Sequence, residues 1–229
     1  MALKRRLSGA GAGKAPGAGK AVAMLVIHKV SSGVGVSNSY IAGDGEAGVI
    51  IDAGANAGDI RRMVGKSGMK PVMILLTHCH FDHIEHVDEI RAEYGIGAAI
   101  HAADARAMSD PVLNGSVLFG PPKALLPPDS LLADGQTVRA GGAEFAIIHT
   151  PGHTPGGICI LSGEALFSGD TIFKGSVGRT DLGGGDFGQL IASIEGRIMR
   201  LGDGVGIYPG HGFQTTVGDE RRTNPFLAT

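Results

Sequence analysis

Residues 77–83 read Thr-His-Cys-His-Phe-Asp-His, and they place four side chains that can bind a metal within seven positions. The run follows the apolar segment 72–76, whose length and composition are typical of a buried strand. Neutral imidazole binds divalent ions and a carboxylate adds negative charge, so a mixed His/Asp set suits zinc or iron. The alternating pairs His78/His80 and Asp82/His83 predict two adjacent ions rather than one.

The composition indicates one domain with a substantial core. The chain has 229 residues, 43% of them hydrophobic and 18% charged, and a chain of this size can bury roughly 70–75% of its surface. Residues 1–20 are rich in Gly, Ala and basic residues, and predict a flexible tail ahead of a single domain at residues 21–229. Neither a secretory signal nor a membrane-spanning stretch is evident. We therefore expect a cytoplasmic protein without a membrane partner, with mitochondrial targeting by the tail as the alternative.

Charge and cysteine content exclude further classes of protein. The net charge of −2 gives no basis for nucleic-acid binding, which needs a dense basic face. Cys79 and Cys159 are too few for a disulfide framework, which favours a reducing compartment. On an extended segment Cys79 would point away from its histidine neighbours, so we expect it to pack in the core. Nothing in the sequence indicates the oligomeric state.

The hydrophobic pattern predicts strands alternating with helices. Strands are expected at residues 22–30, 39–42, 48–52, 72–76, 98–101, 144–149, 158–161, 165–167 and 206–208, and helices at residues 59–66, 84–94 and 190–201. Residues 110–130 contain five prolines and predict a long loop at one rim of the molecule. Two successive halves, each bearing strands and helices, predict two sheets packed face to face with helices outside.

Three further loops each place a single candidate ligand directly after a strand. They are Thr150–Gly156 with His153, Ser168–Thr171 with Asp170, and Tyr208–Gly212 with His211. Alone, a loop histidine is more often a surface residue, and an Asp after Gly is usually a turn former. Together with the cluster at residues 77–83, these residues predict a shared metal site.

In this order the motifs resemble those of the metallo-β-lactamase superfamily, and within it the hydroxyacylglutathione hydrolase (glyoxalase II)-like branch. The resemblance covers about residues 22–226. It rests on the segments at residues 51–54 (Ile-Asp-Ala-Gly), 77–83, 151–156, 167–171, 178–181 (Gly-Arg-Thr-Asp) and 208–211. It implies an α/β (α+β) fold, a four-layer αββα sandwich of two mixed β-sheets flanked by helices, with the site at one edge.

The resemblance also implies a dinuclear centre. The first ion would bind His78, His80 and His153, the second would bind Asp82, His83 and His211, and Asp170 would bridge them. Two divalent ions are the implied cofactors, with zinc expected and iron or manganese as alternatives. Such ions hold a hydroxide nucleophile, and Asp82 would in addition orient it and pass a proton to the leaving group.

Further residues are implied around this centre. Asp52, Thr77 and Thr171 would brace the ligand loops, with ordinary turn capping as the alternative. Arg179 occupies a position where glyoxalase II-like hydrolases keep a basic residue that contacts the carboxylate of glutathione, and Lys174 is a second candidate contact. A clamp from Arg179 to Asp181 or Asp186 is the structural alternative for the arginine.

The sequence departs from the branch at three places. Asp181 stands where the glutathione hydrolases have a tyrosine, Ile84-Glu85-His86 replaces small residues, and the chain ends soon after His211. The leading hypothesis is a dinuclear hydrolase of a small-molecule thioester such as S-lactoylglutathione. The alternative is an iron persulfide dioxygenase using His78, His153 and Asp170. A metal-bound module without catalysis is the third interpretation, which the complete ligand set disfavours.

Overall fold

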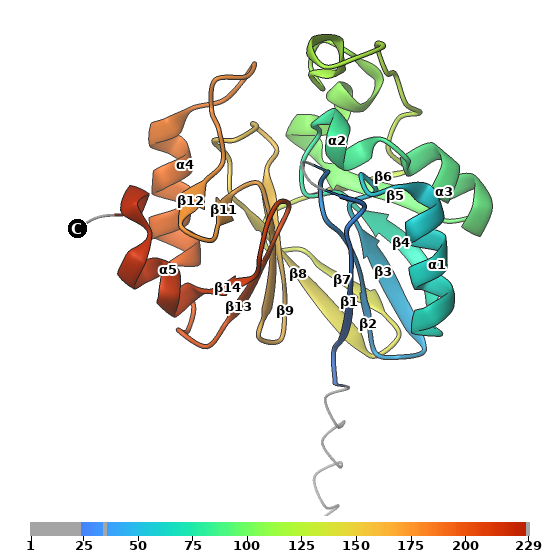
Figure 1. Ribbon diagram of the computed structural model, residues 1–229, viewed down its shortest axis with the longest axis horizontal. Coiled ribbons are helices and arrows are strands. Elements are labelled where there is room, and N and C mark those ends of the chain that lie inside the picture. Colours follow the sequence, from blue (N-terminus) through green and yellow to red (C-terminus); the bar gives the residue numbers. More distant parts are fainter. Residues whose placement is uncertain (1–23, 34–35, 228–229) are drawn as a thin grey trace, which may run out of the picture.

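Two six-stranded mixed sheets pack face to face at the centre of the molecule (Figure 1). The computed structural model describes residues 24–33 and 36–227. The first sheet consists of β1 (Val26–Val30), β2 (Ser39–Gly43), β3 (Ala47–Ile51), β4 (Lys70–Leu75), β5 (Gly97–His101) and β6 (Ser130–Leu132), in that order. Pairing is antiparallel from β1 to β3 and parallel from β3 to β6.

The second sheet has the order β14-β13-β10-β9-β8-β7. Its strands are β7 (Thr137–Ala140), β8 (Ala143–His149), β9 (Ile158–Ser162), β10 (Ala165–Gly169), β13 (Gly206–Pro209) and β14 (Thr215–Thr216). β10 and β13 are parallel, and the other neighbours are antiparallel. A separate hairpin joins β11 (Ile172–Phe173) to β12 (Ser176–Val177).

Helices cover the outer faces of both sheets. In Figure 1, α1 (Ala57–Ser67) and α3 (Val87–Tyr94) lie outside the first sheet, and α4 (Phe187–Ser193) and α5 (Val217–Thr223) outside the second. Shorter helical segments are α2 (Phe81–Ile84), the 3-10 segments at Ala102–Ser109, Ser116–Leu118 and Pro225–Leu227, and a π-helical turn at Ile194–Ile198. The predicted αββα sandwich is thereby confirmed. Across the described ranges, no helix combines the length and apolar character needed to cross a bilayer.

Side-chain alternation in the strands separates three apolar layers. In β3, Val49 and Ile51 face the space between the sheets, whereas Ile50 packs beneath α1 and α3. This is the two-residue period of a strand buried on both faces. A third cluster, which includes Leu166 and Leu190, lies between the second sheet and its helices.

The structure corrects the element boundaries at several places. The helix expected over residues 84–94 is two helices, because α2 ends at Ile84 and α3 begins after His86. The long loop contains the 3-10 turn Ser116–Leu118, and β6 begins at Ser130, its last residue. Strands β6, β7, β11, β12 and β14, and helix α5, have no counterpart among the expected elements. Strands of two to four residues are too short to show a period. The predicted tail, residues 1–20, lies outside the described residues.

Strand direction brings the loops of interest to one edge of the sandwich. The parallel strands β3, β4 and β5 end at the same edge of the first sheet, and β8, β10 and β13 share a direction in the second. The segments that follow β4, β8, β10 and β13 carry the predicted ligands.

Hydrogen bonds join the two sheets at this edge. Asn38 donates from its backbone N to Gly210 O (2.6 Å) and from Nδ2 to Pro209 O (2.9 Å). Tyr40 Oη, also buried, donates to Pro209 O at 2.7 Å. The loop that precedes His211 is therefore held against the first sheet.

Candidate metal centre

Three buried histidines form the first group of ligand atoms. His153 Nε2 lies 2.8 Å from His80 Nδ1 and 3.2 Å from His78 Nε2. Nitrogens that bind one tetrahedral zinc at about 2.0–2.1 Å stand roughly 3.3 Å apart. The spacing in this group is close to that value, so the three nitrogens fit a common ion.

Asp82, His83 and His211 form the second group. His211 Nε2 lies 3.1 Å from Asp82 Oδ2 and 3.3 Å from His83 Nε2. α2 carries Asp82 and His83 on successive residues, while His211 comes from the loop after β13. Two elements from opposite halves of the chain thus supply one set of ligand atoms.

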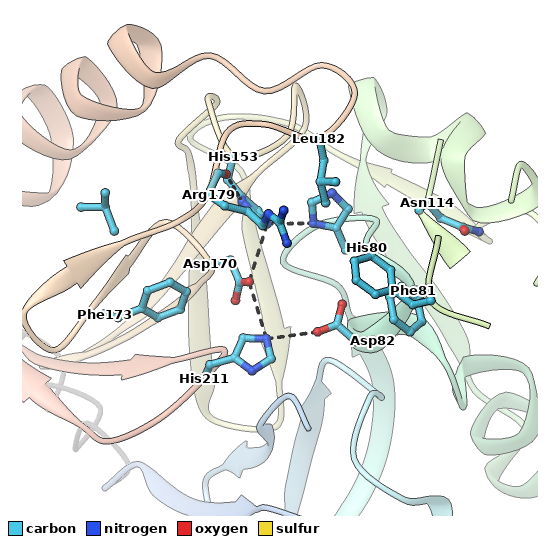
Figure 2. A pocket seen from close by; sticks show the side chains of 13 residues that line it. His80, Phe81, Asp82, Asn114, His153, Asp170, Phe173, Arg179, Leu182 and His211 are labelled. Atoms are coloured by element: carbon cyan, nitrogen blue, oxygen red, sulfur yellow. Dashed lines mark hydrogen bonds and ion pairs between the residues drawn. The ribbon is translucent and has the colours of Figure 1, made fainter. Parts of the chain in front are cut away.

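Asp170 stands between the two groups (Figure 2). Its Oδ2 lies 3.6 Å from both His153 Nε2 and His211 Nε2, and its Oδ1 lies 3.2 Å from His83 Nε2. Among residues 24–33 and 36–227, Asp170 Oδ1 is the one buried side-chain N or O atom without a hydrogen-bond partner. A buried carboxylate oxygen without a donor is costly, and a cation at this position would satisfy it.

The protonation of the cluster suits metal binding at the first group. Burial lowers the pKa of His78 well below its ordinary value, and burial together with His153 lowers the pKa of His80 to about 3. Both rings are therefore neutral at physiological pH and keep a lone pair for a cation.

In the second group the pKa shift has the opposite sign. Burial would lower the pKa of His83, but the carboxylates of Asp170, Asp52 and Asp82 outweigh it and raise that pKa well above its ordinary value. Burial likewise opposes the lowered pKa of Asp170, which His83 and its other histidine neighbours hold down. The carboxylate is thus ionised and suited to bind a cation.

Hydrogen bonds on the outer side of the rings fix their tautomers. His153 Nδ1 donates to Arg179 O (2.7 Å) and His83 Nδ1 donates to Asp52 Oδ2 (2.7 Å), which leaves Nε2 of both rings for the ion. Asp52 also accepts from Thr77 N and Thr77 Oγ1, both at 2.8 Å. Asp52 has a positive φ of 55°, a strained conformation for a non-glycine residue. Thr77 Oγ1 in turn lies 3.1 Å from His78 Nδ1.

Thr171 has a different position from the other two bracing candidates. Its hydroxyl hydrogen-bonds Thr150 Oγ1 at 2.9 Å, and both threonines are buried. Thr150 begins the loop that carries His153. Thr171 therefore connects two ligand loops without contacting a ligand ring itself.

Asp104, which the sequence did not single out, braces the first group. It is 2% exposed and accepts hydrogen bonds from Thr154 Oγ1 (2.7 Å), Gly156 N (2.6 Å) and Cys79 N (3.1 Å). One buried carboxylate thus ties the loop of His78 and His80 to the loop of His153. It lies in a 3-10 segment without a motif, so no pattern in the sequence marked it.

Two glycines of the motifs leave room for the ligands. A Cβ at Gly210 would collide with Asp170 Oδ1 and the ring of His83. A Cβ at Gly54 would collide with the backbone carbonyl of Asp82. Each motif therefore needs glycine where the backbone passes closest to the centre.

A cavity of about 450 Å³ opens over the centre. It is lined by His80, Phe81, Asp82, Asn114, Gly115, Phe119, His153, Asp170, Phe173, Val177, Arg179, Leu182 and His211. Arg179 lines the cavity and also donates to Asp181 from Nε (2.6 Å) and Nη2 (2.8 Å). This pairing is the clamp that the sequence offered as the alternative to a substrate contact. Lys174 is exposed and does not line the cavity, nor do Glu85 and His86.

Neither cysteine offers a nucleophile. Burial raises the pKa of Cys79 well above its ordinary value and that of Cys159 to about 11, so both thiols stay protonated. Cys79 packs in the core beside the first sheet, as expected. In the part of the chain that the structure describes, no Ser, Thr or Cys lines the cavity.

A four-layer αββα sandwich with a His/Asp metal-binding cluster at one edge defines a class of metal-dependent hydrolases. The chain belongs to the metallo-β-lactamase superfamily, whose family profile matches residues 32–211. Hydroxyacylglutathione hydrolase GloC of Haemophilus influenzae is 34% identical over 193 residues, covering 82% of this chain and 91% of GloC.

Solved structures agree with this assignment. BLEG-1 B3 metallo-β-lactamase superposes with a TM-score of 0.85 at 38% identity, covering 89% of this chain and all (100%) of that one. TTHA1623 in a di-iron-bound form has a TM-score of 0.76 at 34% identity, covering 86% and 99% of the two chains. The similarity extends over the whole sandwich in each case.

Proposed function

We propose that this protein is a dinuclear metal-dependent hydrolase of thioesters, with zinc as its metal and a hydroxyacyl thioester of the S-lactoylglutathione type as its substrate. The observation that supports it most is the place of Asp170, whose two oxygens face both ligand groups within 3.6 Å. The similarity to GloC supports the thioester class. The di-iron form of TTHA1623 supports a centre with two ions.

The chemistry divides between the ions and the chain. Two divalent ions, when bound, lower the pKa of a shared water and polarise the attacked carbonyl. His78, His80 and His153 would hold one ion, Asp82, His83 and His211 would hold the other, and Asp170 lies between the two groups. Asp82 Oδ2 lies 3.1 Å from His211 Nε2, which leaves Oδ1 to accept a proton and deliver it to the leaving thiolate.

Arg179 is the proposed contact for an anionic group of the substrate. It lines the cavity and already pairs with Asp181, so a carboxylate would bind by sharing or replacing that partner. We expect Arg179→Ala to raise KM for S-lactoylglutathione several-fold while kcat changes little. Steady-state kinetics of the variant beside Arg139→Ala, an exposed arginine outside the cavity, provides the measurement. Equal KM values for parent and both variants would rule out this role.

Two other activities are compatible with the same residues. An iron persulfide dioxygenase would use His78, His153 and Asp170, which do lie together. β-Lactam hydrolysis is the second alternative, because the similar protein BLEG-1 is named a B3 metallo-β-lactamase. The centre contains a full second ligand group, Asp82, His83 and His211, which a single iron would leave idle, and this favours the hydrolase.

Parallel assays separate these functions. Metal-loaded protein is given S-lactoylglutathione, glutathione persulfide and a β-lactam, and thiol release, oxygen uptake and ring opening are followed. We expect thiol release with zinc and no oxygen uptake with iron. Oxygen uptake by the iron-loaded protein, with no thioester cleavage under any metal, would overturn the proposal.

A further inference from the structure

The cavity over the metal centre has two chemically different sides. The ligands His80, Asp82, His153, Asp170 and His211 make its floor, and the apolar side chains of Phe81, Phe119, Phe173, Val177 and Leu182 make most of the rest. Figure 2 shows Phe81 toward the side of Asn114 and Phe173 across the cavity. Beyond the ligands, Asn114 and Arg179 are the only described residues that bring polar side chains to the lining.

Both of those polar side chains already have partners. Asn114 is fully buried, donates from Nδ2 to Lys123 O (2.8 Å) and accepts from Ser116 N (3.0 Å). Arg179 holds Asp181 with two hydrogen bonds. Away from the ligands, the lining therefore offers one paired cation and a large apolar surface.

The aromatic part of this surface is built as a unit. The rings of Phe81 and Phe119 stack with centroids 5.2 Å apart and an interplanar angle of 21°. Phe81 N donates to Asn114 O at 3.0 Å, which fastens the long loop to the ligand loop. Phe81 stands between His80 and Asp82 in the sequence, so the stacked pair lies directly beside the ions' ligands.

Hydrogen bonds fix the path of the long loop. Asp110 Oδ1 accepts from Val112 N (3.0 Å), Ser116 Oγ accepts from Lys123 N (2.9 Å), and Leu125 N donates to Met108 O (2.9 Å). Phe119, in this loop, is 57% exposed. The same loop exposes Val112, Leu113, Val117, Leu118 and Leu126. Exposed apolar surface is typical of binding sites, and within this loop Phe119 is the exposed apolar residue that lines the cavity.

We propose that the pair Phe81–Phe119 is a subsite for an apolar chain or ring that flanks the scissile bond of the substrate. This inference rests on the proposed thioester hydrolase and narrows its substrates to thioesters with an alkyl or aryl group on one side. The group lies against the stacked rings, and longer chains continue over the exposed side chains of the loop. Whether the acyl or the thiol side carries it is decided by the experiment.

Two substrate series test the proposal. One varies the acyl group from acetyl through butyryl to hexanoyl on N-acetylcysteamine, and the other varies the alkyl thiol of lactoyl thioesters. We expect kcat/KM to rise about two- to fourfold per added methylene in one of the series. A rise in the acyl series assigns the subsite to the acyl group, and a rise in the thiol series assigns it to the leaving group.

Variants connect the effect to the aromatic pair. Phe119→Ala should flatten the dependence on chain length, and Phe119→Leu should restore most of it. Phe226→Ala, which truncates a phenylalanine that is 45% exposed and outside the cavity, should keep the parent's dependence. Thermal unfolding of each variant checks that the fold is retained.

Binding measurements separate this proposal from the proposed function. Calorimetry with non-hydrolysable thioether analogues should show affinity that grows with chain length, and less so in Phe119→Ala. If no thioester is cleaved but this binding pattern holds, the hydrolase proposal fails and the subsite stands. If thioesters are cleaved but neither series depends on chain length, or Phe119→Ala leaves the dependence intact, the subsite is overturned while the hydrolase stands.

Discussion

Asp52 and Asp104 show how single carboxylates outside the ligand set hold the centre together. Asp52 binds Thr77 and His83, and Asp104 binds the two loops of the first histidine group. Both carboxylates are 2% exposed. Each carboxylate accepts hydrogen bonds from several protein donors in place of water, so the ligand rings are oriented before an ion binds.

Asp104→Asn tests this role. The amide keeps the shape but replaces one accepting oxygen by a donor that faces Thr154 Oγ1 or Gly156 N. We expect metal affinity of the first group to fall about 10- to 100-fold, and the free energy of unfolding of metal-free protein to fall by about 1–3 kcal/mol. Chelator competition and urea unfolding provide the two values.

The matched control is Asp129→Asn. Asp129 also accepts a backbone hydrogen bond, from Ala98 N at 2.7 Å, but contacts no ligand loop. It should leave metal affinity unchanged. An Asp104→Asn protein that binds metal as tightly as Asp129→Asn would show that Asp104 does not support the first ligand group.

Site residues could be predicted where they stand in a local sequence motif. His78, His153 and His211 follow strands directly and stand beside turn-forming residues, so their motifs could be read without a structure. Asp104 receives its donors from residues 25 to 52 positions away, and nothing local distinguishes it. Whether a carboxylate such as Asp104 braces the ligand loops depends on which loops meet around it, and that is a property of the tertiary fold.

At the scale of elements, turns at the strand ends away from the centre join the two sheets. Asp44, in the turn between β2 and β3, accepts from Ala47 N (2.8 Å) through Oδ1. Its Oδ2 accepts from Gly142 N (2.6 Å), in the turn between β7 and β8. These backbone donors, with that of Gly142 first, lower the pKa of Asp44 to about 2.

This shift predicts a pH dependence of stability. A carboxyl with a lowered folded-state pKa stabilises the fold above its ordinary pKa of 3.8, and that contribution disappears as pH falls toward about 2. Asp44→Asn should therefore lower the urea midpoint at pH 7, and the difference from the parent should shrink below pH 3.8. Glu46→Gln, whose side chain makes none of these hydrogen bonds, should show little difference at either pH. A constant deficit of Asp44→Asn across this range would contradict the assignment.

Element prediction succeeded where burial was strong and failed where tertiary contacts decide. The apolar run at residues 72–76 lies in β4 up to Leu75, and the strand begins two residues earlier, at Lys70. The split between α2 and α3 was not readable, because the residues at 84, 87, 90 and 94 keep a helical spacing across it. Backbone contacts across the break, such as His86 N to Ala53 O (2.9 Å), set the path of the chain there.

At the scale of the molecule, the centre exists only because both halves fold together. The first half supplies His78, His80, Asp82 and His83, and the second supplies His153, Asp170 and His211. The order of the motifs made the αββα sandwich predictable as a family fold. The stacked aromatic pair at the cavity mouth was not, because its second ring comes from the proline-rich loop.

The dinuclear site is the central claim, and metal stoichiometry tests it most directly. Metal-free protein is titrated with zinc against a chromophoric chelator, beside Asp170→Asn and the control Asp181→Asn, an exposed carboxylate that is not a ligand. We predict two tightly bound ions per chain for the parent and for Asp181→Asn, and weakened binding at both positions in Asp170→Asn, because its carboxylate faces both groups. A parent that binds a single ion, or an Asp170→Asn protein that binds two as tightly as the parent, would contradict the account.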